Sequence, residues 1–480
     1  MHLIILLFAS LSAGTATARQ AGPAPAPSDA PPGVHAAYVV IGEGRDGEAT
    51  AVARVIHDGA DGCPRLVSED VSLEMAPRSD THGFDVRVCE ATIPFDVALR
   101  VSWDGTPLPT VRRHPSRIVL LGDTGCKKKN CGDGPAEPFQ TIAHMAASLE
   151  PPPELVLHAG DFNYRNTGWF EEGTDSVYDA GDDAPDDPRC QLDAPYVSQN
   201  ADGSSRRDSW DAWRDDFFEP GRELLATAPL LAARGNHELC SRSGPGYFLF
   251  LDPATGDEQI ECPPQGSASS PPDGALSHLV FTPPRVIDLG TIRIGVVDSA
   301  NACDGFAPDE LTEIYADQLA SIFSEPSSTP LWLLTHRPFW AVGRDGSDEP
   351  LQPLAVTLQQ ALSLAAPELP STFRLALGGH MHQFLAVTFP EQSHPAQLVV
   401  GNSGVATSLA TPEGPFEATI DQTAARAFGS GTHGFMDLRR DGPHWTATLT
   451  GADGSALVRC TMGAAIECSP AAARRTTVKE

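Results

Sequence analysis

Basic residues are scarce in this chain, where 33 lysines and arginines stand against 63 aspartates and glutamates and the formal net charge is −30. Nucleic acids and anionic membranes bind basic surfaces, so this charge argues against nonspecific binding to either. Long apolar runs are also missing, since nothing beyond the first residues approaches the length of a membrane span. The sequence shows no convincing internal repeat, and no second cysteine pair has the spacing of a zinc site.

The chain begins with a short apolar segment. Residues 1–18 resemble a signal peptide, because the run LIILLFASL precedes small residues that suit cleavage. The alternative is that this segment is not cleaved and anchors the protein to a membrane. We therefore expect export to a secreted or periplasmic location, with no membrane span after cleavage. Residues 19–33 are rich in proline and alanine and predict an extended linker, and residues 471–480 predict a tail.

Ten cysteines in an exported chain predict up to five disulfides. Local closure suggests three pairs, which are Cys63 with Cys89, Cys240 with Cys262, and Cys460 with Cys468. Cys126 and Cys131 flank three lysines, and this loop either attracts phosphate or is simply solvated. The acidic run at residues 171–188 follows the Tyr164 motif. We expect it to be an inserted lid or rim at the site, or a solvated surface loop.

Five short motifs share one arrangement, in which an apolar run stops at a metal-binding side chain. They are IVLLGDTG with Asp123, LVLHAGDFNY with Asp161 and Tyr164, LLAARGNHE with Asn236 and His237, LWLLTHRP with His336, and LALGGHMH with His380 and His382. Such runs are typical of buried strands, and open α/β sheets carry their chemistry beyond the carboxyl ends of strands. These donors exceed the needs of one divalent ion, which predicts two ions sharing a carboxylate.

In this order, GDxG, GDxxY, GNH[DE], a lone histidine and GHxH resemble the calcineurin-like metallophosphoesterases, and among them the purple acid phosphatase type. The resemblance covers roughly residues 115–405. Most of the superfamily has a histidine ligand where this chain has Gly125. In this chain Tyr164 substitutes for that histidine as a ligand. A phenolate is a hard anionic donor that suits ferric iron.

The resemblance implies two ligand sets that share Asp161. The first is Asp123, Asp161, Tyr164 and His382, and the second is Asp161, Asn236, His336 and His380. We expect Fe3+ at the Tyr164 position and Zn2+, Mn2+ or Fe2+ at the other. The reaction implied is hydrolysis of phosphate monoesters by attack of a metal-bound hydroxide.

His237 follows a ligand, so it can point into the site without binding metal, and it is the expected general acid. Glu238 either holds the other imidazole nitrogen or is a plain surface glutamate. A phosphodiesterase or nucleotidase on the same centre is the nearest alternative. A non-catalytic secreted module braced by metals is an alternative of another class.

The sequence departs from the purple acid phosphatase pattern in two places. After His336 the expected second histidine is missing, and Arg337 or Arg344 could bind phosphate in its stead or be a surface residue. Directly after His382, this chain has Gln383 and Phe384 where purple acid phosphatases usually have an aromatic residue and an arginine. Within the second motif, His158 is expected to be a core or supporting residue and not a ligand.

The predicted fold class is α/β: a metallophosphoesterase β-sandwich flanked by helices in four layers (α/β/β/α), preceded by a small all-β domain. Alternating segments place that β-sandwich-like domain at residues 34–114, and the catalytic domain, with its closing strands, at residues 115–470. Apolar periodicity predicts helices over 137–150, 208–227 and 309–323. The oligomeric state is not predicted.

Overall fold

The structure is a computed structural model, and it describes most of the chain beyond residue 32. The described residues are 33–44, 47–59, 62–126, 137–165, 208–240, 242–263, 276, 279–344, 350–391, 393–442, 444–462 and 466–471. The predicted signal peptide, nearly all of the linker and the tail, the three lysines at 127–129 and the acidic run at 171–188 lie outside them. The chain divides into Met1–Pro31 and Pro32–Glu480, and all the described residues belong to the second unit.

Two large mixed sheets dominate the described residues. The first sheet has the strand order β24-β23-β22-β21-β8-β9-β10-β1-β2-β6-β5, and the second has β11-β12-β13-β16-β18-β17-β20-β19. Two small sheets, β14-β15 and β4-β3-β7, accompany them. The strands up to β12 are β1 (Val34–Glu43), β2 (Ala49–His57), β3 (Arg65–Val67), β4 (Ser72–Glu74), β5 (Ala76–Pro77), β6 (Arg87–Ile93), β7 (Arg100–Val101), β8 (Arg117–Leu121), β9 (Leu155–His158), β10 (Leu230–Ala232), β11 (Arg285–Asp288) and β12 (Arg293–Val296). The later strands are β13 (Leu331–Leu334), β14 (Ala341–Gly343), β15 (Gln352–Leu354), β16 (Phe373–Gly378), β17 (Phe384–Thr388), β18 (Ala396–Val400), β19 (Gly414–Ile420), β20 (Thr423–Ser430), β21 (Gly434–Asp441), β22 (His444–Gly451), β23 (Ala456–Met462) and β24 (Ile466–Pro470).

Alternation along the buried strands shows how the sheets are layered. In β8, Ile118 and Leu120 face the core between the two sheets, whereas Val119 points to the opposite face of the first sheet. In β13, Trp332 faces the shared core and Leu333 points to the outer face of the second sheet. Successive side chains of a strand face opposite ways, so each central strand must be apolar throughout.

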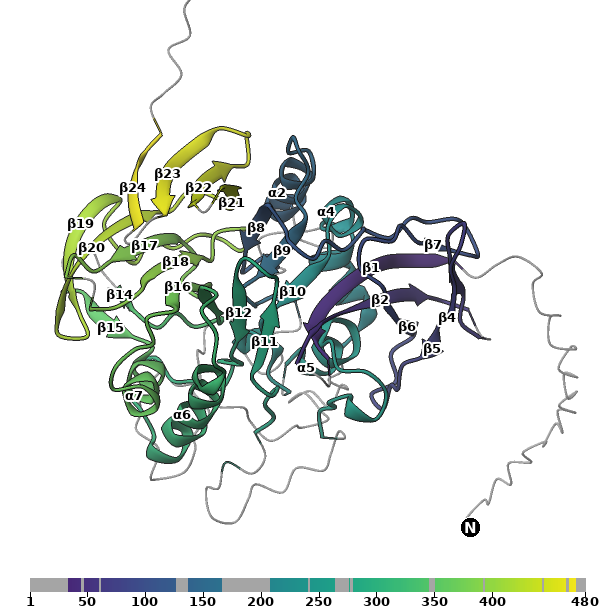
Figure 1. Cartoon of the computed structure of the whole chain (residues 1–480), viewed down its shortest axis with the longest axis horizontal. Helices are drawn as coiled ribbons and strands as arrows, with labels where there is room; N and C mark the ends of the chain where they lie inside the picture. The colour runs from purple at the N-terminus through teal and green to yellow at the C-terminus, as the bar shows by residue number, and fades with distance from the viewer. Residues whose placement is uncertain are drawn as a thin grey trace, which may run out of the picture. The chain divides into compact units, whose positions relative to one another are not determined.

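Helices cover the two outer faces. The helical segments are α2 (Glu137–Ala147), α3 (Trp210–Trp213), η1 (Arg214–Phe218), α4 (Arg222–Thr227), η2 (Asn236–Glu238), α5 (Gly244–Gly246), η3 (Tyr247–Leu251), η4 (Gly256–Glu258), α6 (Asp309–Ser324) and α7 (Val356–Ala365). Side chains of α2, α3 and α4 pack on the first sheet, and those of α6 and α7 pack on the second. Figure 1 shows α2 near α4, and α6 beside α7. The predicted four-layer fold is confirmed.

The predicted helix over 208–227 is interrupted. A π-helical turn, η1, follows α3 directly, and a short break precedes α4. The apolar face itself is as expected, because Trp210, Trp213 and Phe217 are all buried. The sequence pattern therefore identified the packing face but not the local change of helical pitch.

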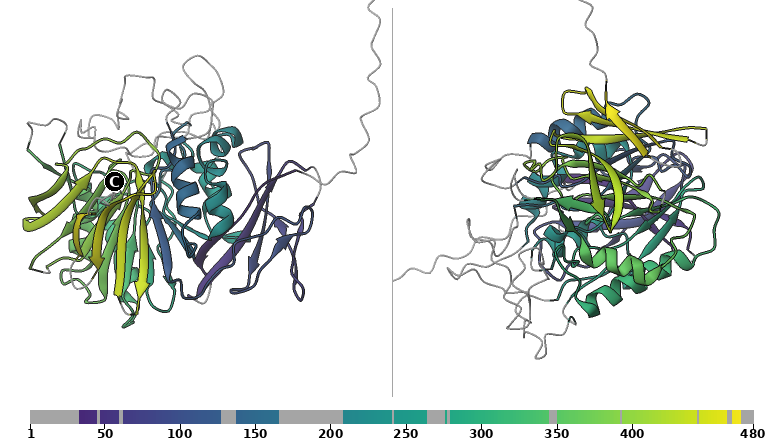
Figure 2. Two further views of the ribbon diagram at one scale, coloured as in Figure 1. Left: turned by 90° about the horizontal axis from the view of Figure 1, so that it is seen from above. Right: turned by 90° about the vertical axis from the view of Figure 1, so that its left-hand side faces the viewer.

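The N-terminal segment consists of β-strands, as predicted, but four of these strands continue the first sheet. Strand β1 pairs in parallel with β10, with Val40 opposite Leu230, and β2, β6 and β5 extend the sheet beyond it. Figure 2 shows these strands in purple at the opposite end from the yellow closing strands. The predicted boundary at residue 114 stays a prediction.

Disulfides join neighbouring segments in three places. The pairs Cys63–Cys89, Cys240–Cys262 and Cys460–Cys468 are present as predicted. Cys126 and Cys303 are disulfide-bonded as well. Among the described residues, no helix combines the length and the apolar character that a membrane crossing requires.

Candidate metal centre

The predicted ligands lie at one edge of each large sheet. Strands β8, β9 and β10 are parallel neighbours, and Asp123, Asp161 and Asn236 follow their carboxyl ends. In the second sheet, β13 and β16 are also parallel neighbours, and they are followed by His336 and by the His380 motif. Parallel strands end at the same edge, so the five motifs converge there.

The four predicted ligands of the first ion meet at the Tyr164 hydroxyl. Its oxygen lies 2.9 Å from Asp123 Oδ1 and 3.0 Å from Asp161 Oδ2. His382 Nε2 lies 3.0 Å from the same oxygen. A phenol, two carboxylates and an imidazole therefore surround one point.

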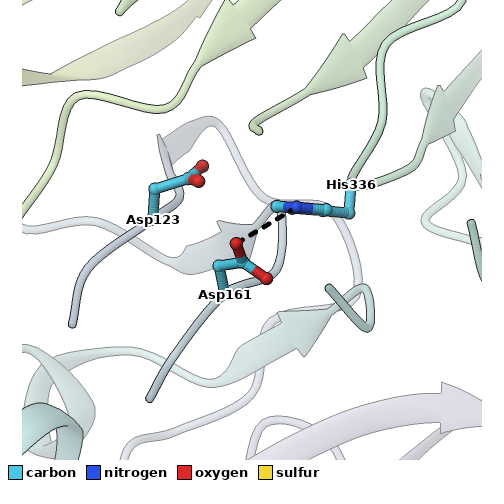
Figure 3. Close-up of side chains that lie close together, drawn as sticks. All are labelled: Asp123, Asp161 and His336. Carbon is cyan, nitrogen blue, oxygen red and sulfur yellow. Dashed lines mark ion pairs between the residues drawn. The ribbon is translucent and has the colours of Figure 1, made fainter. Parts of the chain in front are cut away.

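The predicted ligands of the second ion form an adjoining group. Asn236 Oδ1 lies 3.0 Å from His336 Nε2 and 3.1 Å from His380 Nδ1. His336 Nε2 is also 3.3 Å from Asp161 Oδ2, the contact drawn as a dashed line in Figure 3. One ligand atom from each of Asp123, Asp161 and His336 falls within 4.8 Å of the others. Asp161 thus belongs to both groups.

Hydrogen bonds orient the two imidazoles of the second group. His336 Nδ1 donates to the carbonyl oxygen of Ala159 at 2.7 Å, which leaves Nε2 for a ligand. His380 is turned the other way, since its Nε2 donates to Asp304 Oδ2 at 2.7 Å and Nδ1 faces the group. A hydrogen bond at one ring nitrogen fixes the lone pair on the other.

Gly125 makes room for Tyr164. A Cβ at Gly125 would lie 2.7 Å from Tyr164 Cδ2 and 2.9 Å from Asp216 Oδ2, so any side chain there displaces the phenol ring. Asp216, on η1, accepts a hydrogen bond from the backbone N–H of Tyr164 at 2.8 Å. The glycine of the first motif and the tyrosine of the second are thus one structural feature.

Four of the predicted ligands have left-handed backbone conformations, with φ of 54° at Asp123, 59° at Asp161, 71° at His380 and 41° at His382. Positive φ is uncommon for residues other than glycine and costs energy that the surrounding structure must offset. Such residues cluster at functional sites.

Glu238 has neither of the two roles weighed from the sequence. It is fully buried, and its carboxylate accepts hydrogen bonds from the backbone N–H groups of Asp161 at 3.0 Å and Phe162 at 2.8 Å. It also accepts from the backbone of Gly235 at 3.0 Å. Glu238 therefore ties the loop after β10 to the loop after β9. Burial and the nearby Asp161 raise the pKa of Glu238 to about 8.

Negative charge accumulates in this buried site. Burial raises the pKa of Asp123 well above its usual range, and burial with the two aspartates raises the pKa of Tyr164. Although burial alone raises it, His336 and His237 hold the pKa of Asp161 well below the ordinary value. Buried anions that repel one another are relieved by cations. The donor set therefore fits bound metal cations.

His237 lies over the Tyr164 ring, with ring centroids 4.0 Å apart. Its backbone N–H donates to Asp161 Oδ1 at 2.9 Å, and its own carbonyl accepts from the Ser243 hydroxyl at 2.6 Å. The backbone of His237 is thus anchored on the shared carboxylate. The side chain is half-buried beside the first ligand group.

The two candidate substrate arginines differ in their surroundings. Arg337 is buried, and its guanidinium contacts Asp304 Oδ1 at 3.0 Å and the carbonyl oxygen of Ala300 at 2.7 Å. These contacts within the protein replace the predicted contact with substrate. Arg344 is half-buried directly after β14, and its backbone N–H donates to the carbonyl oxygen of Ala410. Its role stays a prediction.

His158 supports the ligand loops from inside the core. Its Nδ1 accepts from the Gly160 backbone at 3.2 Å, and Nε2 lies 2.9 Å from the Thr124 hydroxyl. Burial lowers the pKa of His158 well below its usual value, so the imidazole is neutral. Its ring stacks on Phe162 with centroids 3.7 Å apart. This is the supporting position expected from the sequence.

Asp304 is the residue of this site that the motifs missed. Although burial alone raises it, the charges of His380 and Arg337 hold the pKa of Asp304 at about 2. The sequence offered only an indirect signal: the apolar run IRIGVV at 292–297 contains β12, the neighbour of β13, and leads into the loop that carries Asp304. That run ends at Asp298 without matching any of the five motifs.

The chain is similar to known proteins in sequence and in fold. The calcineurin-like phosphoesterase family model matches residues 116–384. Purple acid phosphatase 23 of Arabidopsis thaliana is 28% identical over 153 residues, which are 32% of this chain and only 27% of that protein. Purple acid phosphatase PPD1 from yellow lupin (Lupinus luteus) seeds has a TM-score of 0.51 at 14% identity, over 88% of this chain and 72% of that one. GAP50, the anchor in the inner membrane complex of Plasmodium, has a TM-score of 0.38 at 11% identity, over 73% of this chain and 89% of that one.

The family match covers more than half of the chain, and the chain belongs to the calcineurin-like phosphoesterase family. The resemblance to the purple acid phosphatase type is confirmed, with the lupin protein sharing the fold. The family is one of hydrolases that cleave phosphoesters.

Proposed function

We propose that the protein is an exported, dinuclear metal-dependent phosphatase that hydrolyses phosphate monoesters. The observation that carries this proposal is the pair of ligand groups sharing Asp161, with Tyr164 in one and Asn236 in the other. Two ions held by these residues would lower the pKa of water and offset the charge that develops on a phosphoryl group.

The side chains around that centre supply the remaining chemistry. Asp161 spans both groups, and its Oδ1 accepts from the backbone of His237. This contact keeps the imidazole beside the site while leaving the ligand positions to other residues. We assign to His237 the proton that the leaving alkoxide takes up as the ester bond breaks.

The donor types differ between the two positions. Tyr164 and Asp123 are hard oxygen donors, which favours Fe3+ there. Asn236, His336 and His380 suit Zn2+, Mn2+ or Fe2+.

The exposure of two predicted ligands supports a catalytic centre over a structural brace. The side chains of His380 and His382 are 20% and 24% exposed, so one side of the centre is reachable from solvent. Structural metal sites are usually closed, whereas catalytic sites keep a position open for water or substrate.

Export is supported by the cysteine chemistry. The three disulfides Cys63–Cys89, Cys240–Cys262 and Cys460–Cys468 need an oxidising compartment to form and persist. The location proposed is therefore secreted or periplasmic.

The test is turnover of the purified protein, loaded with iron plus zinc or manganese, on p-nitrophenyl phosphate and bis-p-nitrophenyl phosphate. We expect faster hydrolysis of the monoester, and loss of activity when the metals are removed with a chelator. Faster hydrolysis of the diester would move the assignment to a phosphodiesterase. Two bound metals without turnover of either substrate would favour the metal-braced module.

A further inference from the structure

Asp304 joins the second ligand group to a buried arginine. One carboxylate oxygen accepts from His380 Nε2 at 2.7 Å, and the other accepts from Arg337 Nε at 3.0 Å. Asp304 is 8% exposed and Arg337 is 1% exposed, so the contact between these two side chains is largely shielded from water. A hydrogen bond between charged groups is stronger when water is excluded.

The two imidazoles of the second group are held by different partners. His336 donates its outer proton to a neutral carbonyl, that of Ala159, at 2.7 Å. His380 donates its outer proton to a carboxylate at the same distance. An anion behind an imidazole makes the opposite nitrogen a better electron donor, whereas a carbonyl does so less. His380 is therefore the more strongly polarised ligand of the two.

Arg337 balances the charge of this arrangement. Besides Asp304, its guanidinium contacts the carbonyl oxygens of Ser299 at 3.1 Å and Ala300 at 2.7 Å, which lie in the loop after β12. The backbone N–H of Arg337 also donates to the Ser299 hydroxyl at 2.9 Å. The loop after β12 thus holds Arg337, and the guanidinium offsets the charge of Asp304.

We propose that Asp304 is a positioning residue for the second metal ion: by holding His380 Nε2 it aims Nδ1 at the side of Asn236 that faces the centre and sets how tightly that ion is bound. This inference rests on the proposed dinuclear function. Asp304 acts through His380, a predicted ligand of the second ion, so the first ion is affected far less.

The test measures metal affinity in the full-length protein. Asp304→Asn keeps the shape of the side chain and removes its charge. Dialysis against graded chelator with elemental analysis should show the second ion bound about 10- to 100-fold more weakly, which is the usual cost of losing such a partner. The first ion should stay bound as in the unaltered protein. Circular dichroism of the metal-free proteins checks that the fold is intact.

Two further variants separate positioning from simple destabilisation. Asp437→Asn is the matched control, because Asp437 is a buried carboxylate that pairs with Arg117 Nε at 2.8 Å in the first sheet. Arg337→Gln removes the arginine but leaves the carboxylate on His380. We expect both to keep the second ion within about threefold of the original affinity.

Three results would overturn the inference. They are unchanged affinity for the second ion in Asp304→Asn, equal loss of that ion in Arg337→Gln, and equal loss in the Asp437→Asn control. If Asp304→Asn does not fold, Asp304→Ser is judged by the same criterion. An unaltered protein that binds fewer than two ions would instead overturn the proposed function, so the two failures are distinguishable.

Discussion

The first sheet and the second sheet bring different donor atoms to the centre between them. All the oxygen donors, from Asp123, Asp161, Tyr164 and Asn236, follow strands of the first sheet. All the nitrogen donors, from His336, His380 and His382, follow strands of the second. Each predicted ion takes ligands from both sheets. The proposed metal binding would therefore be coupled to the packing of one sheet on the other.

The largest effect is expected where one residue serves both ions. Asp161 lies 3.0 Å from the Tyr164 hydroxyl and 3.3 Å from His336 Nε2. We expect Asp161→Asn to lose both ions and to lower turnover of p-nitrophenyl phosphate by about 10⁴-fold, because two ions supply several kcal/mol. Elemental analysis and turnover are the measurements. Asp211→Asn, on an exposed part of α3, is the control, and two ions retained by Asp161→Asn would contradict the shared position.

A residue that belongs to neither ligand group should affect chemistry without affecting metal content. His237→Ala should lower turnover by about 10²- to 10⁴-fold, the usual contribution of a general acid, with both ions retained. The loss should be smaller for p-nitrophenyl phosphate than for an alkyl phosphate, since a good leaving group needs less protonation. Equal losses on the two substrates would remove the general-acid role.

Tyr164→Phe separates the two ion positions. It removes one donor from the first group and leaves the second group untouched, so turnover should fall about tenfold, or about 1.4 kcal/mol. If the first ion is Fe3+, its tyrosinate absorption in the visible range should disappear in this variant. The measurement is a visible spectrum alongside elemental analysis. A colourless, active, iron-free parent protein would rule out iron at this position.

The smallest effect on turnover is expected far from the centre. Cys460 and Cys468 join β23 to β24 at the end of the first sheet. Replacing both with serine should lower the free energy of unfolding by about 2–3 kcal/mol and leave turnover unchanged. Chemical denaturation and turnover test this. A loss of metal in this variant would show that the whole first sheet, and not only the strand ends, controls the centre.

The sequence was most informative about local features. Each apolar run ends where its strand ends, and the three disulfides were predictable because their partners are close in sequence. The buried face of residues 208–227 was also correct, although η1 interrupts the helix. In contrast, the pairing of β1 with β10 joins residues that are far apart in the chain, and no local pattern encodes it.

The supporting residues were harder to predict than the ligands. Glu238 was considered as a partner of the His237 imidazole or as a surface residue, yet its carboxylate binds backbone N–H groups of two loops. Arg337 was considered for phosphate binding, yet it is buried against Asp304. Any buried carboxylate or guanidinium needs partners, and which partners it finds depends on the packing of distant segments.

The sequence by itself determined the kinds of donor and the strand ends that carry them, because both depend on residues adjacent in the chain. Only the tertiary structure decided which nitrogen of each histidine faces the centre. That choice depends on hydrogen bonds from the other sheet or loop, the Ala159 carbonyl for His336 and the Asp304 carboxylate for His380. The physical reason is that an imidazole has two nearly equivalent nitrogens, and a single contact across the fold selects between them.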